Sequence, residues 1–471
     1  MTGRLKTLWA HEPSRVGLIL TLAFLVRLAV ILPLGNDISL PFRDQNTYYS
    51  LARALVDDGL LGVPSVPRGP YVEFREQHTR PPGFYPAFHD SLCAVWDSSG
   101  YLYGMVPWGK PNSFFEPLYP LLSAGMYLAF GDRFFWWRMV HVFLGVLLVW
   151  LVYDIGKRAF NPKVGALAAL GVCFYPHFVF YSRILMAEAL LLTTLALGFW
   201  AYFRLREKPH WGWAVALGAS FSAFTLTRSF LIAFFPFMAL FVGLFLKDKR
   251  RWGYAALALL AFALVQAPWI YRNSKLHDRL MLMSTRGGYN IWMRNNPYFI
   301  EDELAAEGVK FSAEKLDKLK YHEYILGYPE FTPEQGEIER NQILTDAGIR
   351  FITANPGFFL EMCWIRFQWT VGWRSPGLGP MLNLVALITY GPALLGFLVS
   401  LVWGWKRLGV VLPLWSVVGY FILFYSLTHE GTRYRVPVDP YMILLAVVSA
   451  LWLYDRFTAG KAQHASRDTH A

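Results

Sequence analysis

The sequence contains few charged residues and few cysteines. Of its 471 residues only 16% are charged, whereas 55% are hydrophobic and the mean hydropathy is +0.31. This balance is too apolar for a soluble protein of this length and predicts an integral membrane protein. The three cysteines, Cys93, Cys173 and Cys363, do not have the spacing of metal ligands.

Other signatures are also missing. The net charge of +11 comes from short basic clusters scattered between apolar runs and not from one stripe, so nucleic acid is not an expected partner. No GxxxxGK[ST] phosphate loop occurs, which disfavours direct use of ATP. No internal repeat is evident, and many transporter folds consist of two related halves. These absences argue against nucleic-acid binding, against ATP-driven work and, more weakly, against transport.

Apolar runs long enough to cross a bilayer, roughly 17 to 25 residues, recur along the chain. Ten of them lie at about 16–34, 134–154, 164–181, 184–203, 211–227, 229–246, 252–271, 380–403, 410–427 and 438–455. The expected fold is therefore an all-α polytopic membrane protein with about ten transmembrane helices, and eleven is the alternative number. The first run has no small-residue cleavage site, so we expect a retained helix and not a signal peptide.

Lysine and arginine are concentrated in the connections on one side of the predicted bundle. These connections read DIGKRAFNPK, RLREKP, KDKRR and GWKRL, and they share their side with a tail that contains Arg456, Lys461 and Arg467. The short connections on the other side offer little beyond Arg183, Arg228, Arg433 and Arg435. The positive-inside rule then predicts that both termini are cytoplasmic.

Two long segments, 35–133 and 272–379, then lie on the outer side. We expect a transmembrane module at 1–271 that includes the first of these loops, an outer loop domain at 272–379, and C-terminal spans with a cytoplasmic tail at 380–471. The pieces FFEPLYPLLSAGMYLAFG and NPGFFLEMCWIRFQWTVGWR predict interfacial helices, the second because it mixes aromatic residues with arginine. Helical patterning around AAEGVKFSAEKLDKLKYHEYIL predicts another helix. The sequence assigns no function to the insertion at 62–112.

Ionisable residues gather where the predicted spans reach the outer side. They are Asp44, Arg183, Glu188, Arg228, His429, Glu430, Arg433 and Arg435, and Arg27 lies inside the first span itself. An ionisable group at mid-membrane costs roughly 2.5 to 3.5 kcal/mol on insertion scales, so such groups face a partner or a cavity. Their common side therefore predicts a shared polar cavity.

Each of these residues also has a structural interpretation. Asp44 can be the N-cap of the helix that begins there, because Asp is a favoured cap. Arg183 and Arg228 can extend to the membrane interface, and Arg433 can be an anchor there. Arg27 can pair with Glu188 only to hold two helices together. The sequence leaves these alternatives open.

The combination of arginines and a carboxylate at a membrane surface suits one kind of chemistry. Arginine offers a planar fork to phosphate oxygens, so several guanidiniums fit a phosphate at the level of the lipid headgroups. A carboxylate that faces this phosphate suits a general base. The residues thus predict transfer of a group from a lipid phosphate to a hydroxyl or an amine, with the arginines stabilising the departing phosphate.

Several motifs resemble those of the GT-C superfamily of polyprenyl-phosphate-sugar glycosyltransferases. They are YYSLARALVDDG after an acidic residue, EPLYP, FYSRILMAEAL, LTRSF, GGYNIWMRNNP and HEGTRYRVPVDP, and together they extend over nearly the whole chain, from Arg27 to about Leu453. Within the superfamily the chain is most similar to bacterial relatives of the protein O-mannosyltransferases and of the lipid A aminoarabinose transferase, the type called glycosyltransferase family 39.

The resemblance implies a role for each outer residue. Asp44 would be the general base, and the donor phosphate would bind Arg228, Arg433 and Arg435. The pocket would be lined by Arg27, Tyr48, Arg183, Glu188, His429, Glu430 and Tyr434. The reaction would invert the configuration at the sugar carbon.

The chain departs from the family pattern directly after Asp44. Many relatives have a second acidic residue there, and this sequence has Gln45, so neither a carboxylate pair nor a metal follows from the resemblance. His78 and His89 fit no standard zinc spacing, and no cofactor is indicated. The chain also lacks a WWDYG-type signature, which disfavours transfer of a preassembled glycan to asparagine.

The expected protein is a glycosyltransferase of the bacterial inner membrane. It would take a monosaccharide from a polyprenyl phosphate such as undecaprenyl phosphate and pass it to a glycan, lipid or protein acceptor on the periplasmic face. A transporter or lipid-carrier flippase is the alternative, but charge in the middle of the spans is nearly confined to Arg27. A structural or assembly protein would leave the buried arginines without a purpose.

Overall fold

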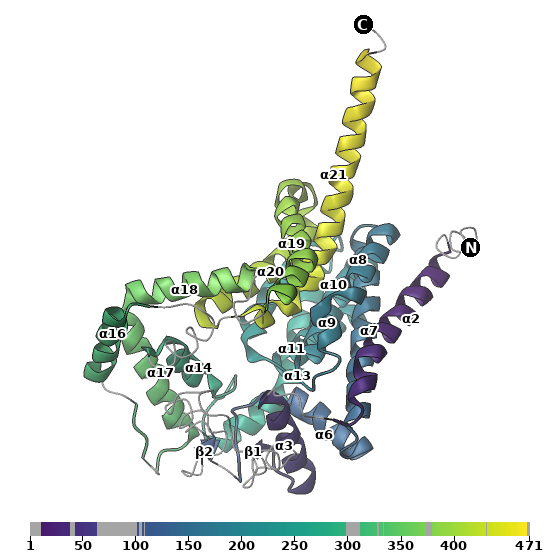
Figure 1. Ribbon diagram of the computed structural model, residues 1–471. Coiled ribbons are helices and arrows are strands. Elements are labelled where there is room, and N and C mark those ends of the chain that lie inside the picture. The colour runs from purple at the N-terminus through teal and green to yellow at the C-terminus, as the bar shows by residue number, and fades with distance from the viewer. Residues whose placement is uncertain are drawn as a thin grey trace.

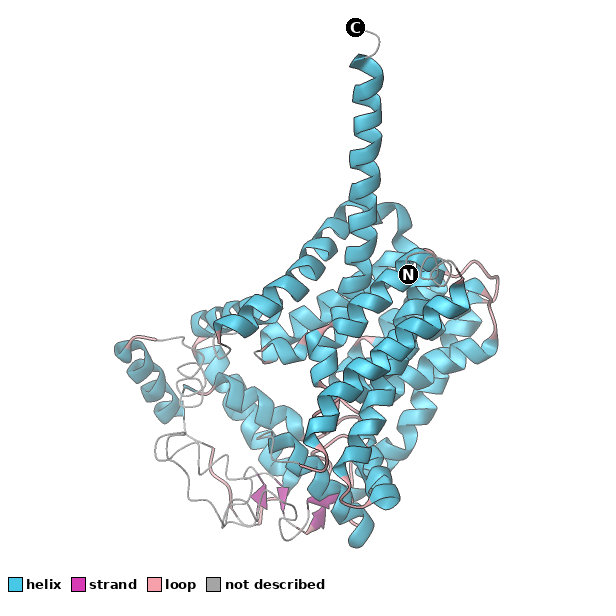
Figure 2. Ribbon diagram, turned by 45° about the vertical axis from the view of Figure 1, so that its right-hand side comes forward, coloured by secondary structure: helices cyan, strands magenta, loops and turns pink. Residues whose placement is uncertain are grey.

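The computed structural model describes residues 11–37, 43–63, 101–102, 106–107, 109–297, 311–326, 329–332, 334–373, 379–429 and 431–468. Within these ranges the chain is almost entirely helical (Figure 2). The strands there form two short antiparallel pairs, β1 (Gly62–Val63) with β4 (Lys110–Pro111) and β2 (Tyr101–Leu102) with β3 (Val106–Pro107). The prediction of an all-α protein is confirmed.

All ten apolar runs form helices, several of them broken or extended by short 3₁₀ turns. The α-helices are α2 (Glu12–Ile31), α7 (Phe134–Ala159), α8 (Pro162–Phe174), α9 (Pro176–Phe180), α10 (Glu188–Glu207), α11 (Trp211–Thr225), α12 (Phe235–Phe245), α13 (Arg251–Leu276), α19 (Pro380–Trp403), α20 (Leu408–Thr428) and α21 (Asp439–Asp468). The 3₁₀ turns are η1 (Leu32–Leu34), η2 (Ser229–Ala233), η3 (Gly404–Arg407), η4 (Thr432–Tyr434) and η5 (Val436–Val438).

Length and composition separate these helices into two groups. Six stretches of the described chain are long and apolar enough to cross a membrane, and one of them, Pro380–Thr428, contains both α19 and α20. The remaining apolar helices are shorter: the run predicted at 164–181 is divided between α8 and α9, and the run at 229–246 between η2 and α12. At 1.5 Å per residue, the 13 residues of α8 extend about 20 Å, less than the roughly 30 Å of a hydrocarbon core. The number of membrane crossings stays a prediction.

The helices pack into one bundle in which α10 contacts both α7 and α11 (Figure 1). Glycines let some neighbours approach closely: a Cβ at Gly218 of α11 would meet the Ala258 carbonyl oxygen of α13 at 2.1 Å. In the same way, a Cβ at Gly396 of α19 would meet Ala446 of α21 at 2.4 Å. Small residues at such crossings give membrane helices their packing contacts. α2 begins and α21 ends on the same side of the bundle (Figure 1).

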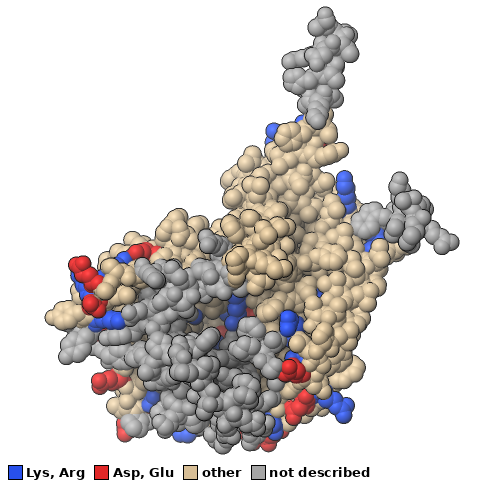
Figure 3. Space-filling model, viewed as in Figure 1, with Lys and Arg blue, Asp and Glu red and all other residues tan. Residues whose placement is uncertain are grey.

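Charged residues are sparse over the bundle (Figure 3). They gather around its lower part and around the helices between residues 286 and 371 at its side. In that view the upper surface, over α19 to α21, is almost entirely uncharged. Its exposed side chains include Leu395, Leu398 and Val402 of α19. An apolar belt of this kind is what a bilayer requires of the surface it contacts.

Two helices from the first outer segment lie at the lower end of the bundle, and their hydrophobic faces meet (Figure 1). They are α3 (Arg43–Asp57) and α6 (Leu118–Phe130), and α6 confirms the helix predicted in the EPLYP region. Tyr49 and Ala52 of α3 pack with Ala124 and Met126 of α6. α3 begins at Arg43, so Asp44 lies in its first turn and is not the residue before the helix.

The second outer segment forms a separate layer to the side of the bundle (Figure 1). Its helices are α14 (Arg286–Asn295), α16 (Ala313–Leu326), α17 (Glu337–Ala354) and α18 (Pro356–Val371). α16 and α18 were predicted, whereas α14 and α17 were not. α18 runs sideways from the bundle to α16, and it exposes Leu360 and Trp364 while burying Arg366.

A buried carboxylate joins the two outer segments. Glu337 of α17 accepts hydrogen bonds from the Ser113 backbone N–H at 3.1 and 3.2 Å and from the hydroxyl of Thr285. The Ser113 hydroxyl in turn lies 2.8 Å from the Nε2 of His277. Burial raises the pKa of Glu337. This group of contacts fixes the outer layer to the start of α6.

Candidate functional site

Glu188 is the first residue of α10, and its carboxylate lies between two arginines from other parts of the chain. The side chain is almost completely buried, and its Oε1 accepts from Arg228 Nη2 at 3.3 Å and from Arg433 Nε. Its Oε2 has no hydrogen-bond partner among the described residues. Three residues that the sequence predicted on one side of the membrane thus meet at the outer end of α10.

Aromatic rings surround this carboxylate and its arginines. The Arg228 guanidinium lies 5.4 Å from the ring centre of Tyr434, within the range of a cation–π contact. Tyr434 stacks on Tyr425 with ring centres 4.7 Å apart, and the ring of His429 lies 5.1 Å from that of Tyr434. The connection between α20 and α21 therefore lies beside the carboxylate and its arginines, and the pocket-lining roles of His429 and Tyr434 stay predictions.

His429 lies within a wider group of cations. Its pKa falls well below the usual value because its surroundings are buried and because Arg294, Arg228, Arg286 and Arg366 are close. Its Nδ1 is buried and has no hydrogen-bond partner among the described residues. A neutral imidazole and several guanidiniums therefore face the same region.

The sequence did not identify three of these cations, the two arginines of α14 and Arg366, as site residues. Arg286 begins α14 and Arg294 is near its end, so both come from the outer layer. Both stand in the stretch that reads STRGGYNIWMRNNP, which was noted only as a motif. Arg366 of α18 donates to the Arg294 backbone carbonyl and so holds the end of α14. The signal that could have found them is a pair of arginines at the two ends of one short amphipathic helix.

The loop that leads into Glu188 is held by two polar residues of α7. Arg138 donates from Nε to the Arg183 carbonyl at 2.9 Å and from Nη1 to the Gly35 carbonyl at 2.8 Å. His141 lies one turn further along α7, with its Nδ1 3.0 Å from the Ile184 carbonyl. Both side chains are fully buried. Sequence reasoning missed them, although an ionisable residue within an apolar run is itself a signal.

Asp44 lies in the first turn of α3, and its side chain falls outside the described part of the structure. The next residue, Gln45, is buried and accepts a hydrogen bond at 2.8 Å from the Leu185 backbone N–H. Tyr48, one turn on, contacts Tyr119 edge-on with ring centres 4.6 Å apart. The first turn of α3 therefore lies beside the start of α10, and the catalytic role of Asp44 stays a prediction.

Glu116 of the EPLYP motif is a further carboxylate near Arg228. Its Oε1 accepts from the hydroxyl of Ser229 at 2.9 Å and from the hydroxyl of Ser284 at 3.1 Å. Because Ser229 follows Arg228 directly, Glu116 helps to fix the backbone that carries this arginine. The sequence gave Glu116 no role.

Arg27 does not meet Glu188 and instead binds the end of a broken helix. Pro176 has no N–H, so the Val172 carbonyl at the end of α8 cannot accept the helical hydrogen bond from residue 176. Arg27 Nη2 donates to Val172 O at 3.5 Å, and Nη1 donates to the Cys173 carbonyl at 3.3 Å. The buried charge in the first span therefore satisfies freed backbone groups, as the membrane interior requires.

Arg435 is also placed away from Glu188. Its guanidinium pairs with Asp439 at 2.9 Å and donates to the carbonyls of Thr370 and Gly372 at 2.8 and 2.9 Å. It also lies over the ring of Tyr390, and its side chain is 1% exposed. These contacts join the end of α18 to α19 and α21.

Arg183, a further predicted pocket residue, has fewer contacts at the site. Arg183 presents its carbonyl to Arg138, and its Nε has no hydrogen-bond partner among the described residues. Glu430 lies outside the described residues, as do His78 and His89. The described residues include no group of three or more His, Cys, Asp or Glu that could hold a metal ion.

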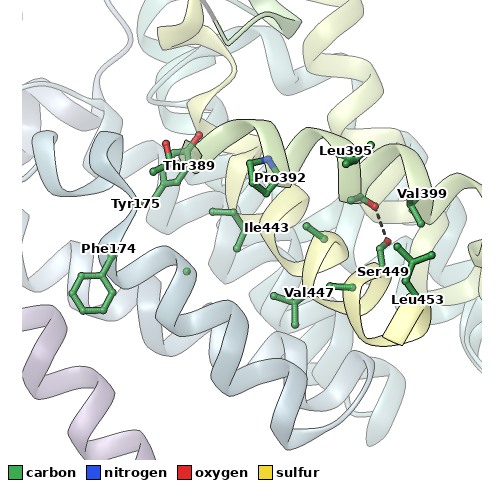
Figure 4. A pocket seen from close by; sticks show the side chains of 15 residues that line it. Phe174, Tyr175, Thr389, Pro392, Leu395, Val399, Ile443, Val447, Ser449 and Leu453 are labelled. Carbon is green, nitrogen blue, oxygen red and sulfur yellow. Dashed lines mark hydrogen bonds between the residues drawn. The ribbon is translucent and has the colours of Figure 1, made fainter. Parts of the chain in front are cut away.

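An apolar groove of about 570 Å³ runs between α8, α19 and α21 (Figure 4). Phe174, Pro392 and Val447 are among the side chains that line it. Tyr175 lies at one end, where its hydroxyl donates to Asp439 at 2.8 Å. Asp439 is the partner of Arg435, so this end of the groove adjoins the connection that also carries Arg433.

Part of the chain matches a known protein family. Residues 110–271, about a third of the chain, match the family model described as dolichyl-phosphate-mannose-protein mannosyltransferase. This partial match agrees with the resemblance to the GT-C superfamily of glycosyltransferases seen in the sequence. No curated protein matches the chain in a sequence comparison.

Solved structures match the chain at low sequence identity. The oligosaccharyltransferase AglB from Archaeoglobus fulgidus, in complex with an inhibitory peptide and a dolichol-phosphate, matches with a TM-score of 0.52 and 13% identity over 96% of this chain. The match covers 52% of AglB, so this chain spans about half the length of that relative. ArnT from Cupriavidus metallidurans, bound to undecaprenyl phosphate, matches with a TM-score of 0.41 and 13% identity over 92% of this chain and 78% of ArnT.

Proposed function

We propose that this protein transfers a monosaccharide from a polyprenyl phosphate to an acceptor on the outer face of a bacterial inner membrane. The observation that carries the proposal is the pairing of Arg228 and Arg433 with the buried carboxylate of Glu188, in a region where the α14 arginines also act on His429. Guanidiniums in this number fit a phosphate that carries a sugar on one side and a lipid on the other. The structural relatives bound to dolichol-phosphate and to undecaprenyl phosphate support a carrier of this class.

In the proposed reaction the acceptor oxygen or nitrogen attacks the sugar carbon that is bonded to the phosphate oxygen. Asp44 takes the acceptor's proton, the bond between that carbon and the phosphate oxygen breaks, and polyprenyl phosphate leaves with the electron pair. Arg228 and Arg433 stabilise the negative charge that develops on the phosphate. One displacement of this kind inverts the sugar carbon and needs no covalent intermediate.

The remaining polar residues position these groups. Arg138, His141 and Gln45 bind the backbone of residues 183–185 and so fix the approach to Glu188. Glu188 holds Arg228 and Arg433 in place before the phosphate arrives, which lowers the cost of ordering them. The apolar groove at α19 and α21 gives the isoprenoid chain a path within the membrane, and one end of it lies at Tyr175, which binds Asp439.

The flippase alternative requires a polar route through the bundle. Arg27, the charge in the first span, donates to the carbonyls of Ala23, Val172 and Cys173, so it lines no such route. A flippase works only between two compartments, whereas a transferase turns over in detergent. Sugar transfer by purified protein in detergent micelles therefore separates the two functions.

The central experiment measures transfer from a labelled polyprenyl-phosphate sugar by purified wild-type protein and by Asp44→Asn. We expect the variant to lose at least 100-fold in kcat, since a positioned general base contributes about 10²- to 10⁴-fold. The matched control is Asp58→Asn, because Asp58 is an exposed residue just after the same helix. Full activity of Asp44→Asn would overturn the assignment of the base.

A further inference from the structure

A second polar cavity, which we call the inner-end pocket, lies at the opposite end of the bundle from Glu188. It has a volume of about 290 Å³ and is bounded by the ends of α7, α10, α12 and α20. Its charged lining residues are Arg158, Arg206, Lys247 and Glu207.

Two of the cations are fixed by contacts within the protein. Arg158 binds Asp154 through Nε at 2.7 Å and Nη2 at 3.2 Å, and it also pairs with Glu207. Arg206 Nη1 donates to the Gly409 carbonyl at the start of α20. These contacts hold the two guanidiniums at the edge of the cavity. Binding of a ligand there would therefore cost little side-chain conformational entropy.

Lys247 differs from these arginines. It is exposed and makes no hydrogen bond or ion pair within the part of the chain that the structure describes. With Arg158, Arg206 and Glu207, it gives the lining of the pocket a formal charge of +2. The protein therefore leaves net positive charge in this cavity unmatched.

The other side of the pocket is apolar. Phe203 of α10, Phe245 of α12 and Val410 of α20 complete its lining. A free inorganic ion makes no use of such a wall, whereas a lipid presents a phosphate and hydrocarbon side by side. Basic pockets between membrane helices at the cytoplasmic end are suited to anionic headgroups.

We propose that the inner-end pocket binds the phosphate group of an anionic membrane lipid. The phosphate lies against Lys247 and Arg206, and the glycerol and first acyl carbons lie against Phe203, Phe245 and Val410. Glu207 stays paired with Arg158. This site is separate from the proposed catalytic site and does not depend on the proposed reaction.

Native mass spectrometry of the full-length protein in detergent tests the proposal. Phosphatidylglycerol and phosphatidylcholine are added in turn to the wild type, to Lys247→Gln and to the double variant Arg206→Gln with Lys247→Gln. Each basic residue near a membrane surface contributes about 1 kcal/mol to anionic lipid binding, so Lys247→Gln should weaken phosphatidylglycerol retention about five-fold. Lys249→Gln is the matched control, because Lys249 is equally exposed in the same basic stretch but does not line the pocket.

The outcomes separate a built site from a general attraction to negative charge. Equal losses in Lys247→Gln and Lys249→Gln, or equal retention of phosphatidylcholine, would overturn the proposal. Displacement of phosphatidylglycerol by millimolar inorganic phosphate would show that the pocket recognises phosphate alone and would overturn the lipid as its ligand. The single variant keeps the test decisive even if loss of the Arg206–Gly409 contact prevents folding of the double variant.

Discussion

The side-chain oxygen of Gln45 accepts a hydrogen bond from the backbone N–H of Leu185 at 2.8 Å. This contact joins the first turn of α3, which carries Asp44, to the loop that leads into Glu188. This bond therefore links the backbone around Asp44 to the approach to Glu188. Gln45, the residue at which the chain departs from the family pattern, therefore connects α3 to the loop before α10.

The effect of replacing Gln45 on catalysis should depend on whether the new side chain can still accept a hydrogen bond from the Leu185 backbone N–H. Gln45→Met has a similar shape but leaves the Leu185 N–H without this partner, which costs about 1 to 3 kcal/mol when the group is buried. We expect Gln45→Met to lower kcat clearly and Gln45→Glu to lower it less. Transfer rates at saturating donor test this order, and a Met variant as active as the wild type would contradict it.

Glu188→Ala should destabilise the outer end of the bundle, because Arg228 and Arg433 would then face each other without a carboxylate. Both arginines are partly exposed, at 25% and 31%, so we expect about 1 to 3 kcal/mol, less than for a fully buried pair. Denaturation midpoints in detergent measure this effect. Adding Arg433→Ala to Glu188→Ala should recover part of the loss, and strictly additive effects would argue against the ion pair.

Arg435 allows a test of two different roles. Asp439→Asn leaves a buried guanidinium without its charged partner and should cost about 3 to 5 kcal/mol. Arg435→Lys should lower the melting temperature as well, because a single ammonium cannot replace both the Nε bond to Asp439 and the Nη1 bonds to the Thr370 and Gly372 carbonyls. A raised donor KM at an unchanged melting temperature would instead support the phosphate-binding role that the sequence resemblance implied.

His429 should make the protein less stable in acid. Its pKa in the folded protein lies well below the ordinary value of 6.5, because burial and the Arg294, Arg228, Arg286 and Arg366 charges oppose protonation. The unfolded chain therefore binds the extra proton below about pH 6.5, and stability falls as the pH decreases from there. The loss cannot exceed about 1.4 kcal/mol per pH unit for one group.

The matched variant is His429→Gln, which cannot take up a proton. Melting curves at pH 7.5, 6.5 and 5.5 should diverge between the wild type and the variant only below about pH 6.5, where the histidine of the unfolded chain titrates. Parallel loss of stability in both proteins would show that other groups govern the acid response.

The helices were predictable because their signal is local. Apolar runs and mixed aromatic and basic stretches identified α2, α6, α18 and α21 without knowledge of their neighbours. The rotation of each helix about its own axis depends on packing, so the sequence could not distinguish Arg433, which reaches Glu188, from Arg435, which turns to Asp439. Only two residues separate them in a stretch of short 3₁₀ turns.

The breaks in the helices were harder to predict than their presence. Pro176 divides the run at 164–181, and the freed carbonyls of α8 account for Arg27, whose apparent partner from sequence was Glu188. The α14 arginines were missed for another reason: they belong to the outer layer, and only the folded chain places that layer near His429. Contacts between side chains of elements far apart in the sequence produce no periodic pattern from which they could be predicted.

The density of guanidiniums around His429 has a consequence for turnover. A polyprenyl phosphate with a sugar attached is a phosphodiester with one negative charge, whereas the phosphate that remains after transfer approaches two, since its second pKa is about 6. A site built from Arg228, Arg433 and the α14 arginines should therefore hold the spent carrier more tightly than the loaded one. Above pH 6, release of the empty carrier would then be the rate-limiting step of the proposed reaction. Added polyprenyl phosphate would inhibit this reaction in competition with the donor.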